Sequence, residues 1–260
     1  MKLKFKKEPR FAELWDACLY NLLYDTKKYV NEILKLFKKN KISKKSKIID
    51  VSVGTGFPAL ELTKKGYKID CMDSMQDEIN VFSRKAKKKK LNLRCKKLTW
   101  LQIPKHYKKN YYDFSFCRGN SFIYAAGGWN KSQKVDAKKS LKLYEETLKI
   151  FYDLLKDGGL LYIDKFKDSE KPHKTKVVEI QIKDKKYDLI FYNEIKNKLN
   201  IRSSAMLLRD KTGKEIGLPN ITYLLSKKEL MNMLRKVGFS SIKEMSFKSE
   251  KHFDIILAKK

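Results

Sequence analysis

The sequence predicts an α/β protein with a doubly wound, mainly parallel sheet, an antiparallel β insert and an N-terminal helical lid. Three observations predict this fold. Short apolar runs alternate with helical patterns over residues 46–166, a glycine-rich turn joins the first run to the next helix, and longer strand-like runs occupy residues 167–225. Strands and helices that alternate with short connections form a parallel sheet covered on both faces. Right-handed crossovers then make that sheet doubly wound.

The elements of the core follow in order. Residues 13–38 form one or two helices, because Val30, Ile33, Leu34 and Phe37 recur at helical spacing. Short apolar runs predict strands over residues 47–53, 67–72, 91–97, 112–117 and 160–164. Helical patterns lie between them, over residues 58–65, 76–89 and 137–155. This order is that of a Rossmann-like core.

The last third of the chain has a different pattern. Strands are expected over residues 177–183, 186–196, 201–209 and 215–225, with a hairpin turn at 211–214. Ser226 and Glu229 form a capping box for a helix that ends at Gly238, and strands over 242–247 and 253–258 close the chain. The expected units are therefore a helical lid (1–45), a core (46–166), an antiparallel insert (167–225) and closing elements of the core (226–260).

Composition limits the function classes. The chain has 260 residues, enough for one full-sized domain, and no apolar run long enough to span a membrane. The basic start of the chain is not followed by an apolar segment, so no secretory signal is expected and the protein is predicted to be cytoplasmic. The four cysteines and three histidines are scattered without a CxxC pair, so no metal site is expected.

The formal charge of +30 has two interpretations. It fits a nucleic-acid partner, or a surface on which solvent-facing positions are simply lysine. Arginine, which nucleic-acid sites prefer for bidentate contacts, is scarce, and the lysines are spread along the whole chain. The second interpretation is favoured, and a nucleic-acid partner stays open.

A glycine loop follows the first strand. Residues 50–56 read DVSVGTG, and small residues there let a ligand approach the backbone where ligands of open α/β sheets bind. Neither the phosphate-loop pattern GxxxxGK[ST] nor the full GxGxxG pattern is present. Asp73 stands just past the second strand, where an acid suits ribose hydroxyls; the alternative is that Asp73 or Ser74 caps the next helix.

Polar segments also follow the third and fourth strands. Thr99 and Trp100 follow the third strand, where Trp100 either packs on an adenine or belongs to the core. Residues 117–122, CRGNSF, follow the fourth and form either a substrate site or a turn. This ordered set resembles class I S-adenosylmethionine (SAM)-dependent methyltransferases. More narrowly it resembles the glycine/sarcosine N-methyltransferase group, with its DVxxGTG loop, Trp after strand three, CxGNSF segment and GGLLxID strand, over roughly residues 46–166.

The resemblance implies SAM as cofactor and N-methylation of a small amine such as glycine, sarcosine or dimethylglycine, the last giving betaine. It implies that Asp73 binds the ribose, that Met75, Thr99 and Trp100 line the adenine, and that Cys117 and Arg118 contact the cofactor through their backbone. The full set of implied cofactor residues is Val53, Gly54, Thr55, Gly56, Asp73, Ser74, Met75, Thr99, Trp100, Cys117 and Arg118. The implied catalytic residues are Asn120, Tyr24 and Tyr192, and the implied substrate residues are Tyr20, Asn120, Trp129, Tyr192 and Tyr223.

The chain also departs from the group. Where the group carries His-Arg after the fifth strand, with the Arg on the substrate carboxylate, this chain has Lys165, Phe166 and Lys167, and the N-terminal arginine that holds the SAM carboxylate is not evident. Alternative functions are methylation of RNA or another nucleic acid, methylation of another metabolite, and SAM binding without catalysis. The Asn-Pro-Pro-Tyr/Phe segment of enzymes that methylate amino groups of nucleobases is absent after strand four. Association of the chain with copies of itself is left open.

Overall fold

Two sheets organise the chain, and the larger one carries the predicted core. The structure, a computed structural model, describes residues 2–127, 135–167, 173–196, 198, 200–217 and 220–260. The strand order of the larger sheet is β12-β13-β6-β5-β2-β3-β4, with every pair from β6 to β4 parallel and β13 antiparallel to both of its neighbours. Its strands are β2 (Ile48–Asp50), β3 (Ile69–Asp73), β4 (Cys95–Lys97), β5 (Tyr112–Cys117), β6 (Leu155–Phe166), β12 (Ser241–Met245) and β13 (Phe253–Lys259). The predicted doubly wound α/β fold is confirmed.

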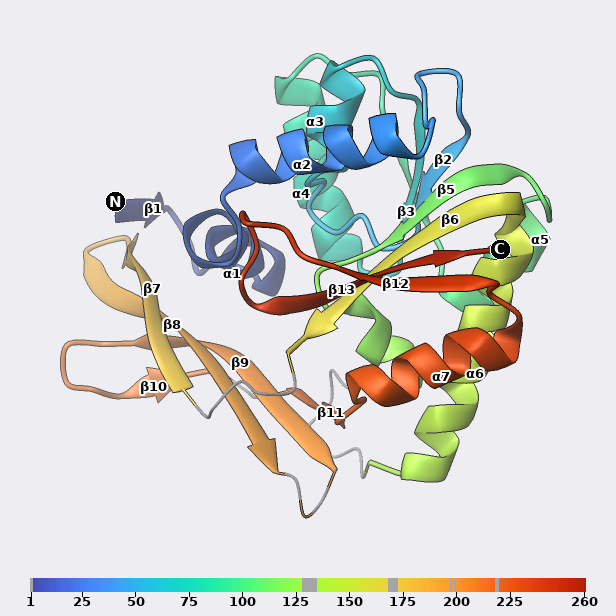
Figure 1. Cartoon of the computed structure of the whole chain (residues 1–260). Helices are drawn as coiled ribbons and strands as arrows, with labels where there is room; N and C mark the ends of the chain where they lie inside the picture. Colours follow the sequence, from blue (N-terminus) through green and yellow to red (C-terminus); the bar gives the residue numbers. More distant parts are fainter. Residues whose placement is uncertain (1, 128–134, 168–172, 197, 199, 218–219) are drawn as a thin grey trace.

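Helices cover both faces of this sheet. On one side lie α2 (Thr26–Lys39), α3 (Ala59–Lys64) and α4 (Gln76–Lys88), and on the other lie α6 (Ala137–Leu154) and α7 (Lys227–Val237) (Figure 1). Phe37 of α2 packs edge-on against Phe114 of β5, with ring centroids 5.0 Å apart, so α2 covers the core sheet directly. The predicted start of α7 is confirmed, because Ser226 and Glu229 form the expected capping box and Gly238 ends the helix at φ +118°.

The second sheet has the order β1-β7-β8-β9-β10, with β11 also paired to β9. Its strands are β1 (Lys2–Phe5), β7 (His173–Ile182), β8 (Lys185–Lys196), β9 (Ile201–Arg209), β10 (Glu215–Ile216) and β11 (Asn220–Tyr223). The expected antiparallel insert is therefore present, but β1 was not expected. It pairs in parallel with β7, a partner far along the chain that local patterns do not reveal. The segment before the core thus contributes an edge strand to the insert sheet as well as helices.

Several predicted boundaries are wrong. Residues 91–94 are outside β4, and the predicted strand over 215–225 is divided into β10 and β11. The glycines at 158 and 159 do not precede β6 but lie within it, since β6 begins at Leu155 and its register against β5 shifts there. The helices of residues 13–38 are α1 (Phe11–Cys18) and α2, joined by the π-helical turn η1 (Leu19–Leu23).

The remaining elements are short. They are η2 (Trp100–Gln102), α5 (Ile103–His106) and η3 (Ser121–Ala126). None of the helices in the described part of the chain is long and apolar enough to cross a membrane. Within the same residues, no group of three or more His, Cys, Asp or Glu side chains is suited to hold a metal ion.

Candidate functional site

A cavity of about 420 Å³ opens at the carboxyl ends of β2, β3 and β5. This is where ligands of doubly wound sheets bind. Its walls come from the glycine loop, the ends of β3 and β5, helix α1 and the insert strands β8, β9 and β11. Ten of the predicted site residues line it: Val53, Gly54, Thr55, Asp73, Ser74, Met75, Thr99, Trp100, Arg118 and Asn120.

Glycine is required at two positions of the loop, Gly54 and Gly56, for different structural reasons. Gly54 has φ +55° and lines the cavity, and a Cβ there would stand 2.5 Å from Oε2 of Glu78. Gly56 has φ +106°, and its Cβ would meet Leu60 at 2.5 Å. Gly56 is not among the residues that line the cavity, and the expectation that it flanks the cofactor stays a prediction. It allows the loop to pack closely on α3.

Asp73 joins β3 to the glycine loop. Its Oδ2 accepts a hydrogen bond from the Gly54 N–H and its Oδ1 accepts one from the Met75 N–H, both at 2.9 Å. Burial raises the pKa of Asp73, and these backbone donors oppose the shift. The carboxylate therefore fixes the loop and still lines the cavity, where it is available to hydroxyl donors of a ligand.

Glu78 is a second carboxyl group beside Asp73. It lies in the first turn of α4, is 7% exposed and lines the cavity. Burial raises its pKa well above the ordinary range, and the nearby carboxylates of Asp73 and Asp16 add to this effect. Glu78 could not be singled out from the sequence, because an acid in the first turn of a helix is common for reasons of helix stability.

An apolar slot extends from Asp73 towards η2. It is lined by Met75, Leu98, Thr99, Trp100 and Leu101. The Trp100 indole N–H donates to the Val51 carbonyl at 2.6 Å, and its ring meets Phe151 edge-on, with centroids 5.6 Å apart. The slot therefore has one rigid aromatic wall, a surface on which a flat ring can pack.

Asn120 follows β5 in a left-handed conformation with φ +61°. Its N–H donates to Asp164 Oδ1 at 2.8 Å, and its Oδ1 accepts from the Phe166 N–H at 2.9 Å. Since Oδ1 is engaged, the free group of this buried side chain is Nδ2, a hydrogen-bond donor. Burial raises the pKa of Asp164 to about 6, although the charge of Arg118 opposes the shift.

Arg118 and Cys117 differ in their surroundings. Arg118 lines the cavity, and its own N–H donates to Ser52 Oγ at 3.1 Å. Cys117 is the last residue of β5, is fully buried in the core and is absent from the cavity lining. The expected contact of the Cys117 backbone with the cofactor stays a prediction.

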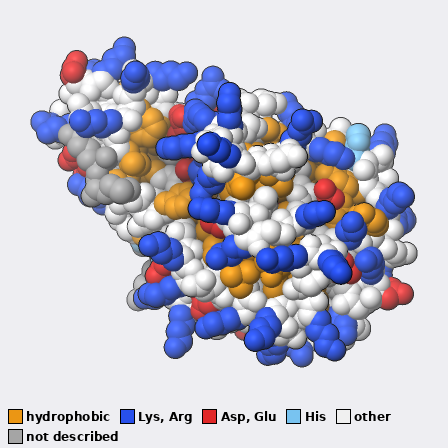
Figure 2. Space-filling model, turned by 90° about the horizontal axis from the view of Figure 1, so that it is seen from above, with side chains coloured by type: hydrophobic (Ala, Val, Ile, Leu, Met, Phe, Trp, Pro, Cys, Tyr) orange, Lys and Arg blue, Asp and Glu red, His pale blue; other side chains and the backbone are white. Residues whose placement is uncertain are grey.

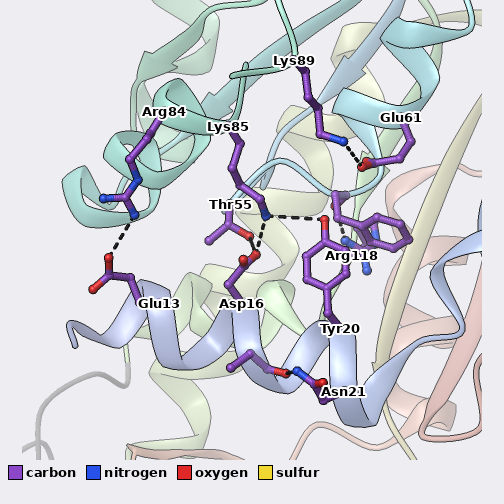
Figure 3. A network of polar contacts seen from close by, with 12 residues as sticks. Glu13, Asp16, Tyr20, Asn21, Thr55, Glu61, Arg84, Lys85, Lys89 and Arg118 are labelled. Atoms are coloured by element: carbon purple, nitrogen blue, oxygen red, sulfur yellow. Dashed lines mark hydrogen bonds and ion pairs between the residues drawn. The ribbon is translucent and has the colours of Figure 1, made fainter. Parts of the chain in front are cut away.

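Helix α1 covers the cavity and is held down by polar contacts. Phe11, Trp15 and Leu19 line the cavity from this side. Asp16 accepts a hydrogen bond from Thr55 Oγ1 at 2.5 Å and pairs with Lys85 of α4 at 2.6 Å (Figure 3). Figure 3 also shows the ion pair between Glu13 and Arg84 one helical turn away, at 3.0 Å. The lid thus contacts the glycine loop itself.

The insert sheet forms the opposite wall. Phe191 of β8, Ser204, Ala205 and Met206 of β9, and Asn220 of β11 line the cavity there. Phe166 of β6 also lines it and packs against Phe191, with ring centroids 5.7 Å apart. Sequence reasoning missed these residues. The strand pattern was visible, but not which of its two faces pointed inward.

The predicted tyrosines do not line the cavity. Tyr192 packs beside Ile190, Ala205 and Leu207, and its hydroxyl donates to Glu194 at 2.6 Å. It follows Phe191, and successive residues of a strand point to opposite faces. Tyr223 is buried in the core and donates to Glu229 at 2.7 Å.

The two tyrosines of the lid region lie behind the cavity wall. Tyr24 is buried and stacks on Phe253, with centroids 5.5 Å apart. Tyr20 lies against Lys85, whose Nζ is 4.7 Å from the ring centroid. None of the four tyrosines is among the residues that line the cavity, and their expected catalytic and substrate roles stay predictions. Trp129 lies outside the described residues.

Comparison with known proteins fits this architecture. No protein-family model matches the chain. Over 119 residues the chain is 28% identical to a glycine/sarcosine N-methyltransferase from Aphanothece halophytica, a match that covers 45% of this chain and 39% of that protein. The chain therefore matches well under half the length of this relative.

Solved structures resemble the whole chain. A SAM-dependent methyltransferase from Clostridium acetobutylicum has a TM-score of 0.68 at 16% identity, over 96% of this chain and 97% of that one. The sugar N-methyltransferase KedS8 from a Streptoalloteichus species has a TM-score of 0.70 at 11% identity, over 98% and 95% of the two chains. The chain thus has the class I SAM-dependent methyltransferase fold.

Proposed function

We propose that this chain, which has the class I methyltransferase fold, is a SAM-dependent methyltransferase. One observation carries the proposal. A single cavity joins the glycine loop, Asp73 and the Trp100 slot on one side to the insert strands on the other. A nucleoside site and an acceptor site that share one cavity are what a direct group transfer requires.

The residues present fit SAM. Asp73 would hold the ribose hydroxyls, the slot beside Trp100 would hold the adenine, and the backbone around Gly54 would approach the methionine part. Bound SAM supplies a methyl group on a positively charged sulfur. The Glu78 carboxyl lies beside the glycine loop, where a bound cation would favour its ionised form and so oppose the burial that raises its pKa. Phe11 and Trp15 of α1 and Leu19 of η1 cover the cavity and exclude water.

We assign the acceptor as a small amine. The partial similarity to glycine/sarcosine N-methyltransferase supports this assignment. An attacking amine must keep its lone pair free, so the Nδ2 donor of Asn120 suits an oxygen of the acceptor rather than its nitrogen. Asn120 therefore positions the acceptor and does not take its proton. An amine that enters neutral needs no catalytic triad, since alignment with the methyl group is the main requirement.

A turnover screen tests the proposal. The chain would be incubated with SAM and glycine, sarcosine, dimethylglycine, other small amines or total RNA, and the S-adenosylhomocysteine formed would be measured. Turnover is expected with a small amine, and Asn120→Ala should lower it at least tenfold while SAM still binds. Binding of SAM without turnover of any small amine would contradict the assignment of the acceptor.

The charge of +30 keeps a nucleic-acid acceptor as the second candidate. Figure 2 shows lysine and arginine side chains scattered over the face of α2, α3 and α4, interspersed with acidic and apolar ones, rather than gathered in a single patch. A scattered charge supports the small amine more than a docked RNA. Methylation of RNA, with retention on heparin that falls steeply with salt, would reverse this preference.

A further inference from the structure

Arg118 has an unusual environment for a guanidinium group. The side chain is 4% exposed and lies among three rings, with its Cζ 4.6, 5.3 and 5.1 Å from the centroids of Tyr24, Tyr29 and Phe57. Its Nη1 donates to the Phe57 carbonyl at 2.5 Å. Cation–π contacts stabilise the charge, but they leave the in-plane N–H donors unused.

Those unused donors form one edge of the guanidinium. Nε and Nη2 are buried, and neither has a hydrogen-bond partner among the described residues. Within the same part of the chain, no carboxylate lies within 4.0 Å of Arg118. The carboxylates of Asp164 and Glu250 interact with its charge from farther away. One oxygen of each accepts a hydrogen bond, Asp164 Oδ1 from the Asn120 N–H and Glu250 Oε2 from the Tyr162 hydroxyl, while Asp164 Oδ2 and Glu250 Oε1 are buried without a hydrogen-bond partner among the described residues.

A buried donor without a partner is destabilising, so two on one side chain indicate a missing partner. The Nε and Nη2 atoms of arginine are spaced to match the two oxygens of one carboxylate. The third nitrogen, Nη1, is already fixed on a backbone carbonyl, which holds the plane of the group in place. The edge is thus a preorganised carboxylate site.

We infer that the Nε/Nη2 edge of Arg118 binds a carboxylate, namely the one on the methionine part of SAM. The inference rests on the proposed function. Both Arg118 and its anchor Phe57 line the cavity, and Phe57 directly follows the glycine loop. The methionine part of SAM is expected beside that loop, and it carries the one carboxylate of the cofactor.

Access to this edge passes the π-helical turn η1. Tyr24, at the end of this turn, lies over the guanidinium, with its ring centroid 4.6 Å from Cζ. Tyr20, within the turn, lies beside Arg118 (Figure 3). π-helical turns occur frequently at functional sites. The ion pairs that hold the adjoining α1 are partly exposed and therefore cost little to break. Binding of a carboxylate at this edge therefore requires the turn to move, because Leu19, Leu23 and Tyr24 are buried against the core.

The test compares SAM with decarboxylated SAM, in binding experiments without acceptor. The wild-type chain is expected to bind SAM about 10- to 100-fold more tightly, as a charge-assisted bidentate pair of about 1.5–3 kcal/mol implies. In Arg118→Met the ratio of the affinity for SAM to the affinity for decarboxylated SAM should fall to about threefold or less. Arg118→Lys should be intermediate, because an ammonium is a single point charge. Arg202→Lys is the matched control, since Arg202 is also buried (3% exposed) but is not among the cavity residues, and its ratio should be unchanged.

The outcomes separate the two proposals. Equal binding of both ligands by the wild-type chain, or an unchanged ratio in Arg118→Met, would overturn the role of Arg118 while SAM binding stands. Binding of neither ligand by the wild-type chain would instead overturn the proposed function. An unchanged SAM ratio with lost binding of amino-acid acceptors would move the carboxylate to the acceptor and refute the assignment to SAM. Thermal melting checks that each variant is folded, and the wild-type ligand comparison needs no variant.

Discussion

Asp73 has two tasks in this structure, and removing its carboxylate should therefore affect folding as well as binding. In Asp73→Ala the N–H groups of Gly54 and Met75 both lose an acceptor at 2.9 Å. Hydrogen bonds to an ionised group contribute about 1.5–3 kcal/mol each, and burial, which raises the pKa of this carboxyl, offsets part of that gain. We expect a net loss of about 2–3 kcal/mol in the free energy of unfolding.

The measurement is urea unfolding of the unliganded chain together with calorimetric titration of SAM. SAM affinity should fall about 10- to 100-fold, because the ribose contact is lost and the glycine loop is less ordered. Asp77→Ala is the matched control, since Asp77 lies in the same segment but on the surface, paired with Arg10, and its loss should cost less than about 0.5 kcal/mol. If Asp73→Ala unfolds with the wild-type free energy and only SAM affinity falls, the reasoning that Asp73 holds the loop is refuted.

Gly56→Ala should destabilise the chain by more than about 2 kcal/mol in urea unfolding, because its Cβ would stand 2.5 Å from Leu60; Gly213→Ala, with open space around it, should cost only about 1 kcal/mol, and equal losses would contradict the packing argument. Burial raises the pKa of Asp50 from 3.8 to about 7, so its protonated form stabilises the fold at low pH and this contribution is lost as the pH rises through 7. Between pH 5 and 7 the wild type should lose about 2–3 kcal/mol relative to Asp50→Asn, and parallel pH profiles would refute this. Asp16→Ala should speed SAM dissociation about fivefold in stopped flow while changing stability by less than about 1 kcal/mol, and an unchanged dissociation rate would exclude a role for this contact in closing the lid.

Much of the core could be predicted because its signals are local. The apolar strands, the helix caps and the order of Gly54, Asp73, Trp100 and Asn120 depend on neighbouring residues, and the carboxyl ends of parallel strands bring such residues together. The fold and one side of the cavity were therefore accessible from the sequence.

The acceptor side was harder because its signals are not local. In β8 the residue that faces the cavity is Phe191, and the one chosen from the sequence, Tyr192, is its neighbour. The sequence of a strand shows that alternate side chains share a face, but not which face points into the cavity. A shift of one residue therefore moves a side chain from the cavity face to the opposite face of the sheet. The pairing of β1 with β7 and the rings around Arg118 join distant segments, which no local pattern encodes.

The path of the chain around α1 has a mechanical consequence. The strand β1 is bonded into the insert sheet, α1 crosses the cavity, and α2 is packed on the core sheet. The cover is therefore a strap fastened at both ends and not a flap hinged at one. A segment held at both ends cannot rotate away from the cavity as a rigid body. It can open only by a local change of conformation between its two attachments, where the π-helical turn lies. The pace at which product leaves would then be governed by how readily that one turn of five residues unwinds.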